Sequence, residues 1–267
     1  MRSNTIQRGT FFRATGTPVA LCVGENVRAS PSPQSFMPTD GIASAASALR
    51  YWERRQEVAA NNLANANTDG FKAERAFARL VGTSDLAIGA QTDWTEGSIT
   101  TTRNPLDLAL RGPAFMVVST PDGERYSRGG SWGVDREGFL TDANGHRALG
   151  EKGPIQVRGN DVTIDRTGRV AVDDVWVDRL RIETVAPNTP LPHQDGVLWV
   201  PPAQRTSQPL ETRDLRQGQL EQSNVAPITE MVDMISIQRN YAFAQKAISV
   251  LDDMRSTITH DLAKPLG

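Results

Sequence analysis

Apolar residues recur at alternating steps of three and four near both ends of the 267-residue chain. The first series follows a candidate N-cap, Asp40, and fades before Gly70, whereas the second follows Pro227 and breaks once, at Arg255. This spacing is typical of a helix with one narrow apolar seam, as in coiled coils. We predict helices of about 25 and about 30 residues. Their seams are Ile42, Ala45, Leu49, Trp52, Gln56, Ala59 and Leu63, and Met234, Ile237, Tyr241, Ala244, Ile248, Leu251 and Ile258.

The middle of the chain has a different period. The run LDLAL at residues 106–110 alternates, and FMVVST at 115–120 is typical of a strand. Further short runs follow, and glycine-bearing turns separate them at fairly regular spacing. This pattern predicts an all-β domain of small barrel or sandwich type. The expected fold class is therefore α+β: long N- and C-terminal helices form a coiled-coil-like helical region, and the central all-β domain is inserted between them.

These patterns divide the chain into segments. We expect an N-terminal helix at residues 40–75, a connector at 76–100, the β domain at 101–200, a return loop at 201–222 and a C-terminal helix at 223–262. Residues 1–39 are interpreted as a disordered or non-native extension, with Met37 as an alternative translation start. Its apolar run PVALCV is short for a signal-peptide core and opens with proline, so no cleaved signal is expected.

Composition excludes several classes of function. The formal net charge is −2 and the pI about 6.0, so no basic field is available to hold nucleic acid or an anionic membrane. A single cysteine rules out an intramolecular disulfide framework and a cysteine-rich metal site. No apolar run approaches the roughly 20 residues of a membrane span.

Catalytic patterns are also missing from the sequence. The three histidines are far apart, and neither a phosphate-binding loop nor a nucleophile elbow occurs. The adjacent aspartates at 173–174 and 252–253 do not form a glycosidase pair, because neighbouring strand residues point to opposite faces and the second pair suits a solvated helix face. We therefore expect no enzymatic activity, no cofactor, no metal and no small-molecule substrate.

Four asparagines stand where the first helix should finish, at Asn61, Asn62, Asn65 and Asn67. Asparagine is a poor helix former but tolerates the left-handed conformation that ends a helix, and Gly70 allows the turn that follows. Asn62 and Asn67 flank the predicted seam, where an amide can specify register. We interpret the segment as a helix stop whose amides also set how subunits register.

This asparagine-rich stretch carries a resemblance. NNLANANTDGFKAE, residues 61–74, closely resembles the N-terminal signature of the bacterial flagellar rod and hook proteins. QGQLEQSNVAPITEMVDMISIQRNYAFAQKA, residues 217–247, resembles their C-terminal signature. NPLDLALRGPAFMVV, RYSRGGSWGVDREGFLTDANG and ALGEKGPIQV are similar to the β domain of the rod subset. The similarity covers about residues 40–260, and the short linker and GEKGPIQV are more similar to the proximal than to the distal rod type.

The resemblance implies a structural subunit of the flagellar basal-body rod, the drive shaft that transmits torque from motor to hook. Its terminal helices would line the axial core and pack against copies of itself and other rod and basal-body subunits. The flagellar type III apparatus would export it without a cleaved signal to the periplasm-spanning rod. The alternatives are a distal rod subunit and a non-flagellar coiled-coil and β-domain scaffold or adhesin.

Assembly contacts are expected in both signatures and along both seams. The candidates are Ile42, Leu49, Trp52, Asn61, Asn62, Leu63, Asn65, Asn67, Gly70, Phe71, Gly218, Leu220, Glu221, Ser223, Asn224, Val225, Met231, Ile237, Tyr241, Ile248, Leu251 and Ile258.

Overall fold

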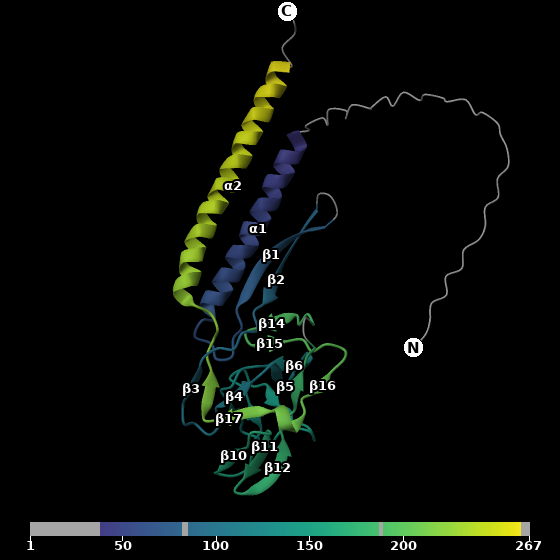
Figure 1. Ribbon diagram of the computed structural model, residues 1–267, viewed down its shortest axis with the longest axis vertical. Coiled ribbons are helices and arrows are strands. Elements are labelled where there is room, and N and C mark those ends of the chain that lie inside the picture. Colours follow the sequence, from purple (N-terminus) through teal and green to yellow (C-terminus); the bar gives the residue numbers. More distant parts are fainter. Residues whose placement is uncertain (1–37, 82–84, 187–188, 263–267) are drawn as a thin grey trace, which may run out of the picture. The chain divides into compact units, whose positions relative to one another are not determined.

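A computed structural model describes residues 38–81, 85–186 and 189–262 (Figure 1). The proposed alternative start at Met37 and nearly all of the expected extension, up to residue 37, lie outside the described residues.

The described residues contain two α-helices, α1 (Pro38–Ala64, 27 residues) and α2 (Pro227–Leu262, 36 residues). The two helices lie side by side and pack against each other (Figure 1). Because α1 also packs against the first two strands of the chain, its burial is not confined to the side that meets α2.

The predicted fold class is wrong in its helical part, because the helices do not form a coiled-coil-like region. A coiled coil needs one apolar seam buried along both partners. On α1 the predicted seam residue Gln56 is exposed and Trp52 is only half-buried, whereas Val58 and Asn62, which lie off that seam, are buried. The described fold is instead a β-rich region between two helices, so the expected central β domain agrees in part.

A long hairpin follows α1. Strand β1 (Glu74–Val81) pairs antiparallel with β2 (Asp85–Thr92), from Glu74 opposite Thr92 to Val81 opposite Asp85. Both strands pack against α1. This hairpin occupies most of the stretch where the sequence indicated only a connector. Because α1 packs against the hairpin as well as against α2, the two helices do not form a simple pair.

The largest sheet has nine strands, and every pairing in it is antiparallel. Its main path runs β14-β15-β6-β5-β9-β8-β7, and β13 joins β5 to β16. The strands are β5 (Ala114–Thr120), β6 (Gly123–Ser127), β7 (Gly133–Val134), β8 (Leu140–Thr141), β9 (Arg147–Ala148), β13 (Ile182–Thr184), β14 (His193–Asp195), β15 (Leu198–Trp199) and β16 (Thr206–Ser207).

Smaller sheets complete the β region. One is formed by β10 (Val162–Ile164), β11 (Arg169–Val172) and β12 (Val175–Arg179). The 3-10 helix η1 (Leu210–Thr212) then leads into two strands that return toward α2. Of these, β17 (Asp214–Gln217) pairs with β4 (Leu108–Arg111), and β18 (Gln219–Glu221) pairs with β3 (Ile99–Thr101). These two pairs bring the segment before α2 back beside the segment after α1.

Three turns of the β region share one construction, written D-x-x-G in the sequence. In each, the aspartate Oδ1 accepts hydrogen bonds from the backbone N–H groups two and four residues later. The glycine has a positive φ, which L side chains rarely adopt. The aspartates are Asp135, Asp142 and Asp165, and the glycines are Gly138 (φ 87°), Gly145 (φ 84°) and Gly168 (φ 83°). This repeated turn explains the regular glycine spacing of the sequence.

Buried apolar residues form one large cluster inside the β region and two smaller ones. The large cluster includes Leu108, Met116, Leu140, Ile182 and Leu215. A second is built on Phe115, Tyr126 and Trp199. The third has Phe71, Ala73 and Val225 as its buried members, with Ala66 and Val197 partly buried against them, so it joins the chain leaving α1 to the chain entering α2. Its position fixes where the two terminal segments cross.

Candidate assembly interface

Helix α2 exposes a row of large apolar side chains. Ile228 is 79% exposed and Phe243 is 71% exposed. The others on this helix are Met231, Val232, Ile235, Val250, Met254 and Ile258. Most recur at steps of three and four, so they form a stripe that we call the outer face of α2. Contiguous exposed apolar surface of this kind marks an interaction site in a soluble protein.

The opposite face of α2 packs on α1. Ile237 is 2% exposed, and Tyr241, Ile248 and Leu251 are half-buried. The side chain of Leu251 lies over Gly41 of α1. Helix α2 is therefore apolar on two sides, one covered within the chain and one bare.

The predicted helix contacts divide between these two faces. On α1, the candidates Ile42, Leu49, Trp52 and Leu63 are all half-buried. On α2, Met231 and Ile258 belong to the exposed side. The candidates on the covered side of α2 are thus already in contact within one chain.

The two signature segments meet at a polar junction beside the base of the hairpin. The backbone N–H of Gly70 donates to the carbonyl of Glu221 at 2.7 Å, and the side chain of Gln222 donates to Asp69 at 3.1 Å. A Cβ at Gly70 would overlap the carbonyl of Arg128, and Gly70 has a φ of 72°. This position therefore admits only glycine without a backbone shift.

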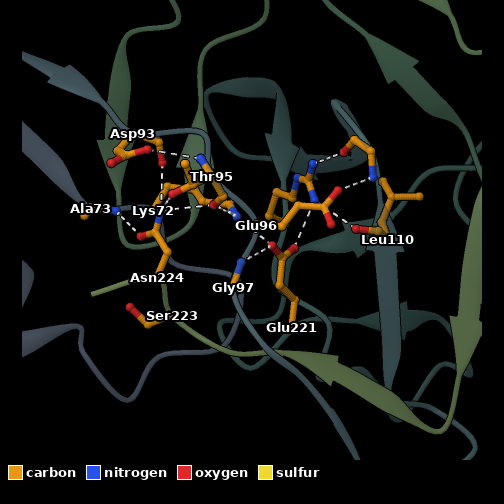
Figure 2. A network of polar contacts seen from close by, with 12 residues as sticks. Lys72, Ala73, Asp93, Thr95, Glu96, Gly97, Leu110, Glu221, Ser223 and Asn224 are labelled. Atoms are coloured by element: carbon orange, nitrogen blue, oxygen red, sulfur yellow. Dashed lines mark hydrogen bonds and ion pairs between the residues drawn. The ribbon is translucent and has the colours of Figure 1, made fainter. Parts of the chain in front are cut away.

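Asn224 holds the start of the hairpin from one side (Figure 2). Its Oδ1 accepts the backbone N–H of Ala73 at 2.7 Å. Its Nδ2 donates to the carbonyl of Asp93 at 2.8 Å and to the carbonyl of Thr95 at 3.0 Å. One amide just before α2 thus joins the residue that precedes β1 to the segment that follows β2.

Asn62 holds the first residue of β1, Glu74, from the helix side. Its Oδ1 accepts the N–H of Glu74 and its Nδ2 donates to the carbonyl of Glu74, both at 2.9 Å. The amide thereby satisfies both backbone groups of that residue. Asn62 is only 2% exposed, so this side chain is committed within the chain.

An ion cluster lies at the centre of the junction. Lys72 Nζ is 2.5 Å from one carboxylate oxygen of Glu221, and Arg128 Nη1 is 2.9 Å from the other. The three side chains are 0%, 3% and 3% exposed, in the order lysine, glutamate, arginine. Burial lowers the pKa of Lys72, although the hydrogen bond and charge of Glu221 oppose that shift.

Two further carboxyl groups flank the base of the hairpin. The hydrogen bond from His193, whose Nδ1 lies 3.3 Å from Glu74 Oε1, is the main reason why the pKa of Glu74 is lowered. Burial raises the pKa of Glu230, which faces Asn62 Nδ2 at 3.4 Å. The junction therefore contains groups whose ionisation is linked to packing.

The structure gathers only part of the predicted signature contacts at the junction. Asn62, Gly70, Phe71, Glu221, Asn224 and Val225 meet there, and Leu220 is buried against Gly130. Ser223 Oγ accepts the N–H of Val225 at 3.2 Å. Asn61 and Asn67 are exposed, Asn65 donates back to the carbonyl of Asn61 at 3.0 Å, and Gly218 donates to the carbonyl of Asp107 at 2.7 Å.

Sequence reasoning missed Lys72, Arg128 and Thr95. A lysine between Phe71 and Ala73, both buried, was the available signal, because lysine is almost never fully buried unless it is paired. Nothing in the linear pattern points from Lys72 to Glu221 or Arg128, which are far away along the chain.

Within the described ranges, no group of three or more histidine, cysteine, aspartate or glutamate side chains is placed to hold a metal ion. No described helix combines the length and apolar character needed to cross a membrane.

Three family models match this chain. Residues 42–72 match the flagella basal body rod protein family, and residues 216–260 match the C-terminal region of the flagellar basal body rod FlgEFG proteins. Residues 109–172 match the D1 domain of the flagellar hook proteins FlgE/F/G. The matches cover most of both helices and parts of the junction and of the β region.

Relatives that match over most of the chain agree with these matches. The flagellar basal-body rod protein FlgF of Escherichia coli (strain K12) is 34% identical over 223 residues, which cover 74% of this chain and 88% of the relative. FlgF of Caulobacter vibrioides is 30% identical over 227 residues, covering 79% and 93%. The rod protein FlgG of Agrobacterium fabrum is 29% identical over 259 residues, covering 83% and 98%. The resemblance predicted from the terminal signatures is confirmed, and the chain belongs to the family of flagellar basal-body rod proteins as an FlgF-like member.

Proposed function

We propose that this rod subunit polymerises through its terminal helices and so helps to build the proximal part of the drive shaft that transmits torque from motor to hook. Its partners are copies of itself and neighbouring rod and basal-body subunits. Its relatives are structural rod proteins, and we assign no catalytic role to the chain.

The exposed outer face of α2 is the observation that supports this proposal. Ile228, Val232 and Phe243 are 79%, 58% and 71% exposed. Burying a large apolar side chain contributes roughly 1.5–3 kcal/mol, so covering several of them in a neighbouring subunit would drive association. The covered face of the same helix stays attached to α1, which would present the bare face in a fixed direction.

Site-directed variants of the outer face test this function. Val232→Asp combined with Phe243→Asp places two charges on the stripe, and Gln245→Asp adds a charge at an exposed polar position of the same helix. We expect the double variant to abolish swimming of a strain that lacks the native copy, while the control supports it. Basal bodies isolated from the double variant should lack the hook, and its purified chain should keep its helical circular dichroism. Normal swimming of the double variant contradicts the proposed interface.

The route of export follows from the assignment of the chain as a rod subunit. We infer export through the flagellar type III apparatus without removal of a signal segment, with the basal-body rod as the destination. Mass spectrometry of the protein recovered from isolated basal bodies tests this, since a new N-terminus produced by signal peptidase would contradict it.

A further inference from the structure

Three separate parts of the chain contribute one side chain each to the ion cluster. Lys72 lies between α1 and β1, Glu221 is the last residue of β18 before α2, and Arg128 directly follows β6 in the largest sheet. The cluster therefore links the segment after α1 and the segment before α2 to the β region.

The cluster has two cations and one carboxylate. The Oε1 of Glu221 accepts from Lys72 at 2.5 Å and from the N–H of Gly97 at 3.1 Å, and its Oε2 accepts from Arg128 at 2.9 Å. Both oxygens are thus committed. Among the described residues, Glu221 is the carboxylate bonded to each of these cations.

The remaining bonds of the two cations are to neutral carbonyl groups. Lys72 Nζ donates to the carbonyl of Thr95 at 2.8 Å. The guanidinium of Arg128 donates to the carbonyl of Leu110 at 2.8 Å and to that of Gly112. Carbonyl dipoles solvate a buried cation but do not cancel its charge. The charge of Glu96 also acts on Lys72, but Glu96 is exposed and, among the described residues, is ion-paired with neither cation, so the charge balance inside the buried cluster depends on Glu221.

We propose that Glu221 is a charge lock between the helices and the β region: by pairing with both Lys72 and Arg128, it holds the connections of α1 and α2 against the end of β6, so that the helix pair and the largest sheet move as one body. Without its negative charge, two buried cations would face each other unpaired, and the junction would open to hydrate them. The asparagine amides do not replace this lock, because Asn62 and Asn224 attach the hairpin rather than the largest sheet.

The lock is a property of the single folded chain. Its consequence for carrying torque between the helices and the β region rests on the proposed function, whereas the lock is tested on the purified monomer. Failure of one therefore does not decide the other.

Spin-label distances measure the coupling directly. In a Cys22→Ser background, labels are placed at Gln245→Cys on α2 and Arg136→Cys in the β region, both exposed positions. We expect Glu221→Gln to broaden the distance distribution at least twofold. The matched control is Glu151→Gln, which removes the charge of an exposed pair with Arg179 inside the β region and should leave the width unchanged.

Charge counting separates the lock from simple packing. Lys72→Met leaves one cation and one carboxylate, so its distribution should stay narrow. Adding Lys72→Met to Glu221→Gln removes one of the two unpaired cations. The distance distribution of this double variant should therefore be narrower than that of Glu221→Gln but broader than that of Lys72→Met. If Glu221→Gln alone does not fold, the double variant is compared with Lys72→Met and should be the broader of the two.

Two results would overturn the proposal. One is a folded Glu221→Gln chain whose distance distribution is as narrow as that of the native chain. Where Glu221→Gln does not fold, the equivalent result is a double variant whose distance distribution is as narrow as that of Lys72→Met. The other is a double variant at least as broad as Glu221→Gln, since packing and not charge would then hold the junction.

Discussion

The outer face of α2 and the junction reverse the usual relation between polarity and burial. The outer face is the most apolar exposed surface of the described helices, with Ile228 79% and Phe243 71% exposed. The junction is rich in charged and amide groups, yet Lys72, Glu221 and Asn62 are between 1% and 3% exposed. One is an apolar surface that the chain itself leaves bare, whereas the other is a crossing of chain segments whose polar groups are paired within the chain. Stability should therefore depend on the junction, and assembly on the outer face.

The largest expected effect on stability comes from removing the charge of Glu221. Breaking a buried ion pair by removing one partner costs about 3–5 kcal/mol, which for a chain of this size lowers Tm by about 10 °C. Glu221→Gln should show this loss in urea unfolding, because two cations are left buried. Lys72→Met is the comparison, and we expect it to be far milder. Equal losses for the two variants would contradict the charge imbalance.

The amides of α1 give the next largest contrast. Asn62→Ala leaves the N–H and carbonyl of Glu74 without their partner, and each buried unsatisfied group costs about 1–3 kcal/mol. Asn65→Ala removes local bonds at the end of the helix, to Asn61 and from the hydroxyl of Thr68, and leaves no strand residue without a partner, so its effect should stay within about 0.5 kcal/mol. Chemical denaturation of both variants measures the difference. A loss at Asn65 as large as that at Asn62 would assign the asparagines a shared role in ending the helix.

The pH dependence of stability tests the buried lysine. Because the pKa of Lys72 is lowered from 10.5 in the folded chain, the unfolded chain binds more protons between the folded pKa and 10.5. Stability from this group therefore rises as pH rises through that window. Urea unfolding should show that, between pH 7 and pH 10, the free energy of unfolding of the native chain rises relative to that of Lys72→Met. A difference that does not change would place Lys72 in ordinary solvent.

Glu74 should show the same direction of pH dependence, at acid pH and with a smaller effect. Its pKa is lowered from 4.5, chiefly by the hydrogen bond from His193, so its contribution is present above pH 4.5 and is lost as pH falls through the folded pKa. We expect the stability difference between the native chain and Glu74→Gln to shrink from pH 6 to pH 3. A difference that grows on acidification would reverse the assignment of this pair.

The smallest effect on the isolated chain is expected at the outer face. Phe243→Ser removes an apolar side chain that is already 71% exposed, so unfolding free energy should change by no more than about 0.5 kcal/mol. The same variant should weaken incorporation into basal bodies, measured by the amount recovered with them. A large loss of monomer stability would mean that Phe243 packs within the chain.

Local pattern anticipated much of the fold but misjudged how its parts combine. The apolar period placed both helices, and the glycine turns indicated the β-rich middle, which the D-x-x-G turns explain at Asp135, Asp142 and Asp165. The hairpin of β1 and β2 had no such signal: Phe77 and Leu80 are exposed, so their strand lacks a clean alternation. Without that hairpin, a single seam on α1 appeared to be a coiled coil.

Sequence alone was sufficient for what depends on neighbours along the chain: the helix periods, the turn chemistry and the terminal signatures that place the chain among rod proteins. Only the tertiary structure decided which faces are covered, that Asn62 bonds within the chain, and that Lys72, Arg128 and Glu221 share one buried site. The physical reason is that periodicity records which side of an element is apolar, whereas the pairing of buried charges requires segments more than 50 residues apart to meet at hydrogen-bond distance, as the 149-residue separation of Lys72 and Glu221 shows.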